Sequence, residues 1–252
     1  MKLSVVIITH NEEQNIGRCL DSIGTLADEI IVLDSFSTDQ TESICKSKGV
    51  LFYQRAWMGF SHAKNFANSL ATGSHILSLD ADEAVSPELY NVIQEIKKNP
   101  LYDAYEISRL TQYCGKWIRH GGWYPDVKIR IFKKEACQWV GGVHEELVFN
   151  TPPKITHLSG DLLHYSYRTV DTHLRKILTY CTLAVQHDIE RGKKYNLFLH
   201  GIIKPWFAFV RMYFLRLGFM DGFYGWVIAC ISCFEKFLRY AKYRELKNKS
   251  RS

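Results

Sequence analysis

The sequence is sparing with the residues that mark fibrous, disordered or cross-linked proteins. Only 6 prolines and 16 glycines occur among its 252 residues, which excludes collagen-like and Pro/Gly-rich disordered chains. The seven cysteines show no paired spacing apart from Cys230 and Cys233, and no second pair completes a disulfide framework or a zinc site. We therefore expect reduced thiols in a compact protein with a large core.

Long hydrophobic runs are absent as well. The longest uncharged run of the C-terminal part covers residues 222–234, which is 13 residues, whereas about 18–20 residues are needed to span a bilayer. The apolar run at the N-terminus is short and Glu12 and Glu13 follow it closely, so no signal peptide is predicted. We expect a cytoplasmic protein without a transmembrane helix.

Charge is unevenly distributed along the chain. From Tyr195 to the end there are 10 basic and 3 acidic residues, whereas the first 194 residues hold 22 basic and 23 acidic ones. The C-terminal segment is also rich in aromatic residues, and this mixture is typical of helices lying in an anionic membrane interface. We expect this segment to dock on the inner face of the cytoplasmic membrane; the alternative is that its helices pack on protein. The neutral body argues against nucleic-acid binding.

Strands and helices are predicted to alternate in the first part of the chain. The β-branched run at residues 3–9 is typical of a strand buried in a parallel sheet. Further strands are predicted at 29–34, 50–54, 75–79, 104–110 and 127–132, and helices at 11–23, 39–48, 61–71, 87–98 and 171–191. Ser37 or Thr38 is expected to cap the second helix. The pattern predicts an α/β fold with a doubly wound, mixed, mainly parallel sheet over residues 1–165, followed by a helical extension over residues 166–252.

Polar residues gather where the predicted strands end, which is where such sheets bind ligands. Asp34 ends the second strand, and Asp80 and Asp82 follow the fourth. The chain has neither GxGxxG nor GxxxxGK[ST], so phosphate must be held in another way. Two carboxylates on one side of an extended backbone suit a hard divalent cation whose other ligands come from substrate phosphates. An isolated Asp-Xaa-Asp is more often a helix cap or a surface feature, but its place after a buried strand favours the metal.

Four segments carry a resemblance to a known family: residues 4–13 (SVVIITHNEE), 31–39 (IVLDSFSTD), 63–65 (AKN) and 79–83 (LDADE). Together they resemble the family 2 glycosyltransferases, which are inverting enzymes of GT-A fold that use nucleotide-diphosphate sugars. Three more segments, 121–126 (GGWYPD), 130–132 (RIF) and 143–145 (VHE), are similar to a subgroup that includes bacterial lipopolysaccharide-core glucosyltransferases. The resemblance covers about residues 1–165.

The resemblance implies a donor site at the strand ends. Thr9, Asn11 and Glu13 would line the nucleoside pocket. Asp34 would accept a hydrogen bond from the uracil ring or the ribose; the alternative is a carboxylate that caps the Ser/Thr-rich turn after it. Lys64 would neutralise the diphosphate, unless it is an ordinary exposed helix lysine.

The same resemblance implies a metal and a catalytic base. Asp82 would coordinate Mg²⁺ or Mn²⁺, while Asp80 would face the sugar or the nucleoside. Inverting transfer requires a group that takes the proton of the attacking hydroxyl, and Glu145 corresponds to the family's base. Here it follows His144 and is a Glu, which departs from the more common Glu-Asp pair. His144 could orient that carboxylate or fill the core.

Asp126 is the alternative base. Trp123 and Tyr124 precede it and could form an aromatic platform for an acceptor sugar, although a Pro-Asp step also favours an ordinary turn. A contribution of His164 to the divalent-ion site is open.

The predicted function is inverting, metal-dependent transfer of a sugar, by default from UDP-glucose. The acceptor would be a hydroxyl of a glycan or lipid-linked molecule, such as the lipopolysaccharide core. The alternative is a catalytically silent, membrane-tethered module that binds a sugar nucleotide or glycan.

Overall fold

The computed structural model describes residues 1–141 and 145–249 and divides into two compact units. The first unit comprises Met1–Arg109 and Asp126–Tyr165, and the second comprises Leu110–Pro125 and Ser166–Ser252. The sequence-based division at residue 165 therefore differs from the structure at one segment, because residues 110–125 cluster with the second unit rather than with the first.

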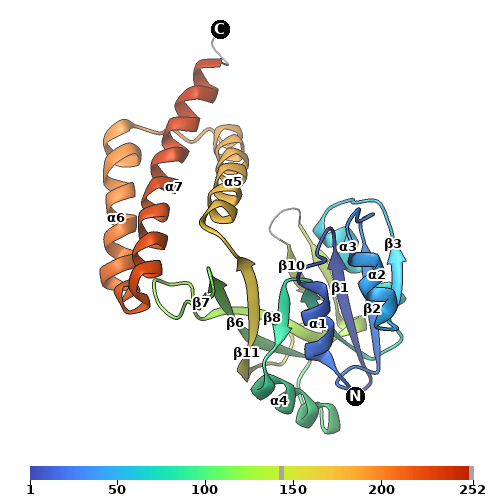
Figure 1. Cartoon of the computed structure of the whole chain (residues 1–252). Helices are drawn as coiled ribbons and strands as arrows, with labels where there is room; N and C mark the ends of the chain where they lie inside the picture. The colour runs from blue at the N-terminus through green and yellow to red at the C-terminus, as the bar shows by residue number, and fades with distance from the viewer. Residues whose placement is uncertain (142–144, 250–252) are drawn as a thin grey trace. The chain divides into compact units, whose positions relative to one another are not determined.

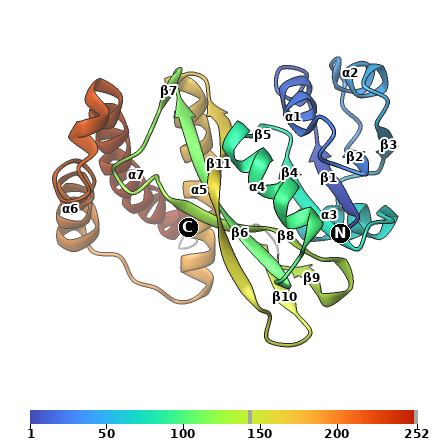
Figure 2. The same ribbon diagram turned by 90° about the horizontal axis from the view of Figure 1, so that it is seen from below.

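Among the described residues, nine strands form one sheet in the order β3-β2-β1-β4-β8-β6-β11-β5, with β7 paired to β6 (Figures 1 and 2). The strands are β1 (Leu3–Thr9), β2 (Glu29–Asp34), β3 (Leu51–Gln54), β4 (His75–Asp80), β5 (Glu83–Val85), β6 (Ala104–Tyr113), β7 (Lys116–Trp117), β8 (Asp126–Lys133) and β11 (Ile155–Tyr167). Strands β1 to β4 pair in parallel, whereas β8 pairs antiparallel with both β4 and β6. The predicted α/β fold with a mixed sheet is confirmed.

Successive residues of the central strands face opposite sides of the sheet, and a core lies on each side. Val5 and Ile7 of β1 pack with α1 (Ile16–Ile23) and α4 (Pro87–Lys98), whereas Val6 packs with α3 (Phe60–Leu70). The alternation follows from the two-residue period of a strand. Burial on both faces explains why β1 is a continuous run of apolar residues.

Two helix starts differ from the predictions. The first helix begins at Ile16 rather than at residue 11, because the preceding residues form a turn. The second, α2 (Thr41–Ser47), is not capped by Ser37 or Thr38. Instead Asp39 Oδ1 accepts hydrogen bonds from the Thr41 amide at 3.0 Å and the Thr41 hydroxyl at 2.6 Å.

Five of the described strands were not predicted from the sequence, among them the short strands β5 and β7. Strands β9 (Cys137–Val140) and β10 (Glu146–Phe149) form a separate antiparallel pair, and β11 runs for 13 residues. The sequence of β11 does not show the alternation of apolar and polar residues that is typical of a strand, because the strand is buried at only a few positions. It pairs antiparallel with β5 and sets His164 opposite Glu83.

The second unit is helical and has its own cores. It contains α5 (Val170–Glu190), the π-helical turns Leu197–Ile203 and Arg211–Leu215 around α6 (Lys204–Val210), a short 3-10 turn (Gly218–Asp221) and α7 (Gly222–Lys249). Ile177 and Cys181 of α5 pack with Ile231 of α7, and Tyr113, Ile118 and Ile228 form a second cluster. The predicted helical C-terminal extension is confirmed.

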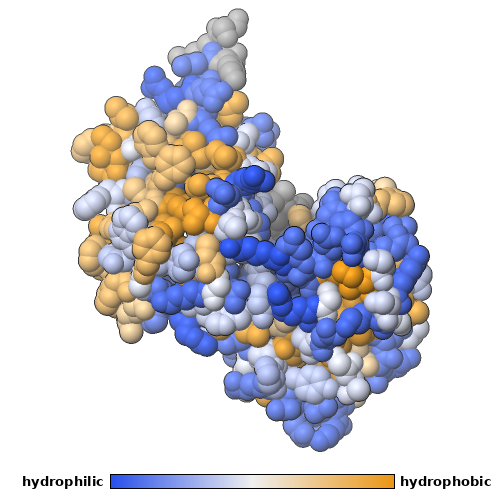
Figure 3. Space-filling view, in the orientation of Figure 1, coloured by the Kyte–Doolittle hydropathy of each residue, from blue (hydrophilic) through white to orange (hydrophobic). Residues whose placement is uncertain are grey.

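Hydrophobic side chains gather on the outside of α6 and α7, as Figure 3 shows in orange. Within the described residues, no single helix has both the length and the apolar composition needed to cross a membrane. The helical stretches Leu197–Leu215 and Gly218–Asn248, bent by 71° at their junction, meet that test only as a pair and only by length and composition.

Candidate active site

The loops that follow β1 and β2 are joined side by side. Asn11 adopts a left-handed backbone conformation, with φ of 54°. Its amide donates to Ser37 Oγ and its Oδ1 accepts from the Thr38 amide, both at 2.8 Å. Glu13 Oε2 accepts from the Gln40 amide at 3.0 Å. Asn11 and Glu13, two of the predicted nucleoside-pocket residues, thus build the edge formed by these two loops.

Asp34 lies fully buried at the end of β2. Its Oδ2 accepts hydrogen bonds from the Ser37 amide at 2.8 Å and from Gln54 Nε2 at 3.2 Å, and its Oδ1 accepts from the Ser37 hydroxyl. These contacts fit the alternative of a carboxylate that stabilises its own turn, so a direct contact with the nucleoside stays a prediction. Thr9 is also buried, and its hydroxyl has no hydrogen-bond partner among the described residues.

A chain of ion pairs in the first unit joins two predicted donor-site residues, Lys64 and Asp80, to both candidate bases. Lys64 Nζ lies 2.7 Å from Glu145 Oε1 and 3.7 Å from Asp80 Oδ1. Asp80 Oδ2 accepts from Arg130 at 2.9 Å, and Arg130 also contacts Glu83. Glu83 in turn contacts Arg109 at 3.4 Å. Opposite charges therefore alternate without a break along this path.

The path ends at the second predicted base. The Nε of Arg109 donates to Asp126 Oδ2 at 2.9 Å, and Lys128 Nζ lies 3.2 Å from Asp126 Oδ1. Glu145 and Asp126, the two candidate bases, are thus the terminal carboxylates of one charge network. Each of them is paired with a cation.

Burial and the network's charges set the protonation of its members. Burial alone would raise the pKa of Asp80, but Arg130 and Lys64 outweigh it and hold that pKa well below its usual value. Burial raises the pKa of Glu83, although Arg130 opposes this effect. For Asp126, the Arg109 guanidinium more than offsets burial and lowers the pKa. Asp80 and Asp126 are therefore ionised at neutral pH.

The β9–β10 pair brings Glu145 to Lys64. The side-chain amide of Asn65 in α3 donates to the Trp139 carbonyl at 2.8 Å and accepts from the Trp139 amide at 2.9 Å. The Trp139 ring lies 4.6 Å from Lys64 Nζ. Glu145 directly precedes β10, so these contacts between α3 and β9 place its carboxylate beside the lysine. Lys64 is almost fully buried, unlike an ordinary exposed helix lysine.

Asp82 lies beside His164, which β11 supplies. Asp82 Oδ2 is 3.3 Å from His164 Nε2, and the Asp82 carbonyl accepts from the Tyr165 amide at 2.9 Å. Within residues 1–141 and 145–249, no group of three or more His, Cys, Asp or Glu side chains is arranged to hold a metal ion. The described part of the chain can thus offer an ion the carboxylate and imidazole of this pair, and further ligands would have to come from substrate.

The predicted acceptor residues belong to the second unit. Trp123 packs in an aromatic cluster, with ring centroids 5.8 Å from Tyr113 and 5.1 Å from Tyr167. The Tyr124 ring lies 5.6 Å from the Arg119 guanidinium. These two residues are therefore not in the unit that holds the ion-pair network. His144 lies outside the described residues.

Sequence reasoning missed three members of the network: Glu83, Arg109 and Arg130. Each lies on a strand, and Glu83 and Arg130 are almost fully buried. Charged residues are rarely buried without a partner. An arginine in the apolar strand pattern of Arg130-Ile131-Phe132 was therefore a usable signal. It could indicate a buried pair but not which acid forms it.

The chain was compared with family models, with curated proteins and with solved structures. A family model described as glycosyl transferase family 2 matches residues 4–165. An uncharacterized glycosyltransferase of Rickettsia typhi is 34% identical over 262 residues, covering 100% of this chain and 89% of its own length. The lipopolysaccharide core biosynthesis glycosyltransferase LpsC of Rhizobium meliloti is 26% identical and covers 96% of this chain and 92% of its own length. Glucosyl-3-phosphoglycerate synthase of Mycobacterium tuberculosis superposes with a TM-score of 0.35 at 25% identity, over 45% of this chain and 44% of that one.

Proposed function

Because the chain belongs to glycosyl transferase family 2 and is a nucleotide-sugar-dependent glycosyltransferase, we propose that it is an inverting, metal-dependent enzyme. Its donor would be a nucleoside diphosphate sugar, with UDP-glucose as the default. Its acceptor would be a hydroxyl of a glycan or lipid-linked molecule. The observation that carries this proposal is the contact of Lys64 with both Glu145 and Asp80.

Lys64 stabilises the leaving group in this mechanism. Transfer with inversion builds negative charge on the departing nucleoside diphosphate, and a nearby ammonium group offsets it. Lys64 is held between two carboxylates in a largely buried position, where its ammonium group can meet the diphosphate. An incoming diphosphate competes with those carboxylates for the same ammonium group, which is a compact charge on a flexible stem.

That competition favours Glu145 over Asp126 as the base. In the absence of substrate, the Glu145 carboxylate is engaged by Lys64. When the diphosphate draws Lys64 away, a Glu145 oxygen becomes available to accept the proton of the acceptor hydroxyl. Asp126 has no such release, because Arg109 holds it through two nitrogens and also contacts Glu83. We therefore assign proton abstraction from the acceptor hydroxyl to Glu145.

Asp82 and His164 fit a divalent cation. A carboxylate suits Mg²⁺ or Mn²⁺, and Mn²⁺ also accepts an imidazole nitrogen, while both ions take ligands from substrate phosphates. When bound, the ion would supply Lewis-acid stabilisation of the diphosphate charge. The chain's own part is to hold the carboxylate and imidazole together through the bond between Tyr165 and Asp82.

The test separates transfer from donor binding. Glu145→Gln should lower turnover about 10²–10⁴-fold, which is the usual contribution of a general base. Donor binding, measured by thermal shift, should be retained in this variant. Glu146→Gln is the matched control, since it alters the neighbouring exposed carboxylate. A Glu145→Gln enzyme with full turnover, alongside an inactive Asp126→Asn enzyme, would move the base to Asp126. Donor binding by the wild type with no transfer or donor hydrolysis would instead favour a silent binding module.

We further propose that the enzyme works at the inner face of the cytoplasmic membrane on a lipopolysaccharide-core acceptor. The name of the relative LpsC supports the acceptor class, and the exposed aromatic residues of the second unit support the location. Phe198 and Trp206 are 69% and 66% exposed, and basic residues surround them in sequence. Such surfaces bind anionic interfaces. Flotation with phosphatidylglycerol vesicles tests it: the Phe198→Ser/Trp206→Ser variant should bind them less than the wild type.

A further inference from the structure

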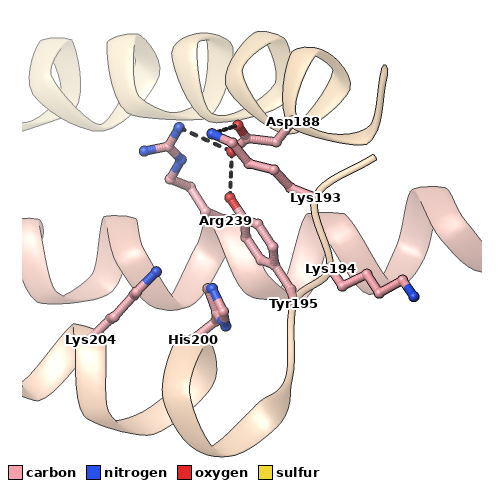
Figure 4. A pocket seen from close by; sticks show the side chains of 7 residues that line it. All are labelled: Asp188, Lys193, Lys194, Tyr195, His200, Lys204 and Arg239. Atoms are coloured by element: carbon pink, nitrogen blue, oxygen red, sulfur yellow. Dashed lines mark hydrogen bonds and ion pairs between the residues drawn. The ribbon is translucent and has the colours of Figure 1, made fainter. Parts of the chain in front are cut away.

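A cavity of about 450 Å³ lies within the second unit, among residues that no role described above involves. Its lining comes from the end of α5, the loop after it, the Leu197–Val210 helical segment and α7 (Figure 4), and consists of Asp188, Lys193, Lys194, Tyr195, His200, Lys204 and Arg239. Four of these side chains are cationic and a single one is a carboxylate. The lining therefore carries net positive charge, which suits an anion.

Asp188 positions the side chains on one side of this cavity, and its single negative charge does not cancel the positive charge of the lining. It contacts Lys193 Nζ and the Tyr195 hydroxyl, each at 2.6 Å, and lies 3.9 Å from Arg239. Burial alone would raise the pKa of Asp188, but these hydrogen bonds outweigh it and lower the pKa. Tyr195 in turn stacks between His200, at 4.4 Å, and Tyr243, at 4.5 Å. These contacts hold Asp188 and Tyr195 in place without a ligand, which reduces the entropy lost on binding.

Two cationic groups keep unused hydrogen-bond donors. Arg239 Nε is buried and has no hydrogen-bond partner among the described residues. The ammonium group of Lys204 makes no ion pair or hydrogen bond with a described residue, and Figure 4 shows it beside His200 on the side of the cavity away from Lys194. Leaving a buried donor such as Arg239 Nε unsatisfied is costly, whereas Lys204 is an exposed side chain whose ammonium group can turn to a ligand. Both side chains line the cavity, and a planar guanidinium and an ammonium group each suit the oxygens of a phosphate group.

The cavity shares its chain segment with the exposed apolar surface. His200 lies between Phe198 and Ile202, which are 69% and 53% exposed, and Trp206 follows Lys204 by two residues at 66%. A ligand bound here would place its anionic group in the cavity and any apolar portion against these side chains. A free phosphate ion would leave the apolar side chains uncovered, whereas a phospholipid would cover them.

We propose that this cavity binds the phosphate group of an anionic phospholipid, so that one lipid headgroup is held specifically while the neighbouring aromatic residues enter the interface. This inference rests on the proposed membrane location. The cavity would provide a saturable lipid site, in addition to the non-specific electrostatic attraction between the second unit and an anionic membrane.

The experiment compares two charge-matched pairs of substitutions in the full chain. Lys204→Gln/Arg239→Gln removes two charges from the cavity, and Arg191→Gln/Arg244→Gln removes two charges from exposed positions outside it. Non-specific electrostatic attraction to the vesicle contributes about a fivefold change in affinity per basic residue near the surface. This contribution should decrease equally in the two double variants. We expect the cavity pair to lose at least tenfold more affinity than the control pair for phosphatidylcholine vesicles containing phosphatidylglycerol.

A soluble probe identifies the ligand. Monomeric dihexanoyl phosphatidylglycerol should raise the apparent melting temperature of the wild type and of the control pair but not of the cavity pair. Inorganic phosphate at the same concentration should raise it less; an equal effect would overturn the lipid assignment in favour of free phosphate. The single variant Lys204→Gln should also lose the response. Because the Lys204 ammonium group has no bonded partner within residues 1–141 and 145–249, this variant guards against misfolding of the pair.

The two proposals fail in different ways. Equal vesicle binding by the cavity pair and the control pair would overturn the lipid site and leave membrane association standing. Wild-type protein that ignores anionic vesicles altogether would overturn the membrane location, and the lipid site with it.

Discussion

Arg130 is the single residue on which the charge network depends most, because it stands between two carboxylates that are otherwise close to each other. It contacts Asp80 and Glu83 and is almost fully buried. Both carboxylates raise its pKa against the opposing effect of burial. Removing one partner of a buried ionic group leaves the other charge uncompensated, which costs more than the net worth of the pair.

We therefore predict that Arg130→Met lowers the free energy of unfolding by about 3–5 kcal/mol. Lys128→Met is the control: it breaks the half-exposed pair with Asp126, and such pairs contribute about 0–1 kcal/mol. Urea denaturation measures both. Equal, small losses in the two variants would mean that Asp80 and Glu83 do not depend on Arg130 for compensation.

The sequence could predict the acidic residues of the site but not their partners. Asp34, Asp80 and Asp82 end predicted strands, so strand-end logic and family resemblance both point to them. Arg130 reaches Asp80 because β8 runs antiparallel beside β4. Arg109 reaches Glu83 and Asp126 from β6, which pairs with β8. Pairing between strands far apart in sequence is not written in any local pattern. His164 was left open for the same reason, since β11 was not predicted.

At the scale of elements, Glu29 joins the first residues of β2 to two other segments. Its Oε1 accepts hydrogen bonds from the Ser4 hydroxyl in β1, and from the Thr72 hydroxyl at 2.9 Å and the Gly73 amide at 3.1 Å in the turn before β4. Burial alone would raise the pKa of Glu29, but the hydrogen bonds from Ser4 and Thr72 outweigh it and lower the pKa. The ionised form is therefore the one that holds these segments together.

A pH-dependent prediction follows from that lowered pKa. The stabilisation by Glu29 is complete above its unfolded pKa of about 4.3 and is lost as pH falls through the lower folded pKa. Glu29→Gln should lower the free energy of unfolding by about 1–3 kcal/mol at pH 7, and this difference should shrink below about pH 4. Glu95→Gln is the control, since its carboxylate is 71% exposed in a pair with Lys98. A constant difference between wild type and Glu29→Gln from pH 7 to pH 3 would contradict the assignment.

Gly160 is where β11 passes under the start of α4. Its φ is +86°, and an added Cβ would lie 2.4 Å from the Leu89 amide nitrogen. Gly160→Ala should therefore destabilise the protein by about 2–4 kcal/mol through overpacking and backbone strain together. Gly49→Ala separates the two causes, because Gly49 has φ of +69° but nothing within 4 Å of the added carbon. In thermal unfolding, the melting temperature of Gly160→Ala should be well below that of Gly49→Ala. Equal decreases in the two variants would show that backbone strain alone destabilises them.

Elements with strong local signals were predicted closely, and those fixed by tertiary contacts were not. Residues 3–9 and 29–34 are strands, and α4 begins at Pro87 and ends at Lys98 as predicted. In α4, Ser86 caps the Leu89 amide and Pro87 follows it, which is a strong helix-start pattern. By contrast, β9 and β10 are four residues each and stabilise one another by pairing. Nothing in so short a segment distinguishes it from a loop.

At the scale of the whole molecule, the two units have separate hydrophobic cores. The clusters around β1 and α3 contain residues of the first unit only, and those around Ile228 and Ile231 contain residues of the second only. The proposed donor site draws its ligands from the first unit, whereas the basic cavity and the exposed aromatic residues belong to the second. The proposed chemistry and the proposed membrane attachment therefore belong to different units and can be tested independently.

Because the cores are separate, we predict two unfolding transitions. A donor ligand should shift only the transition of the first unit. A ligand that binds only the native state stabilises it by RT ln(1 + [L]/Kd), or about 2.7 kcal/mol at a hundredfold excess over Kd. UDP-glucose with Mn²⁺ should therefore raise the transition of the first unit and leave the other unchanged in a calorimetric scan. Asp82→Asn should remove the part of the shift that depends on Mn²⁺, while a variant of the exposed Asp21, Asp21→Asn, keeps it. A single transition that moves as a whole would show that the two cores unfold as one cooperative unit.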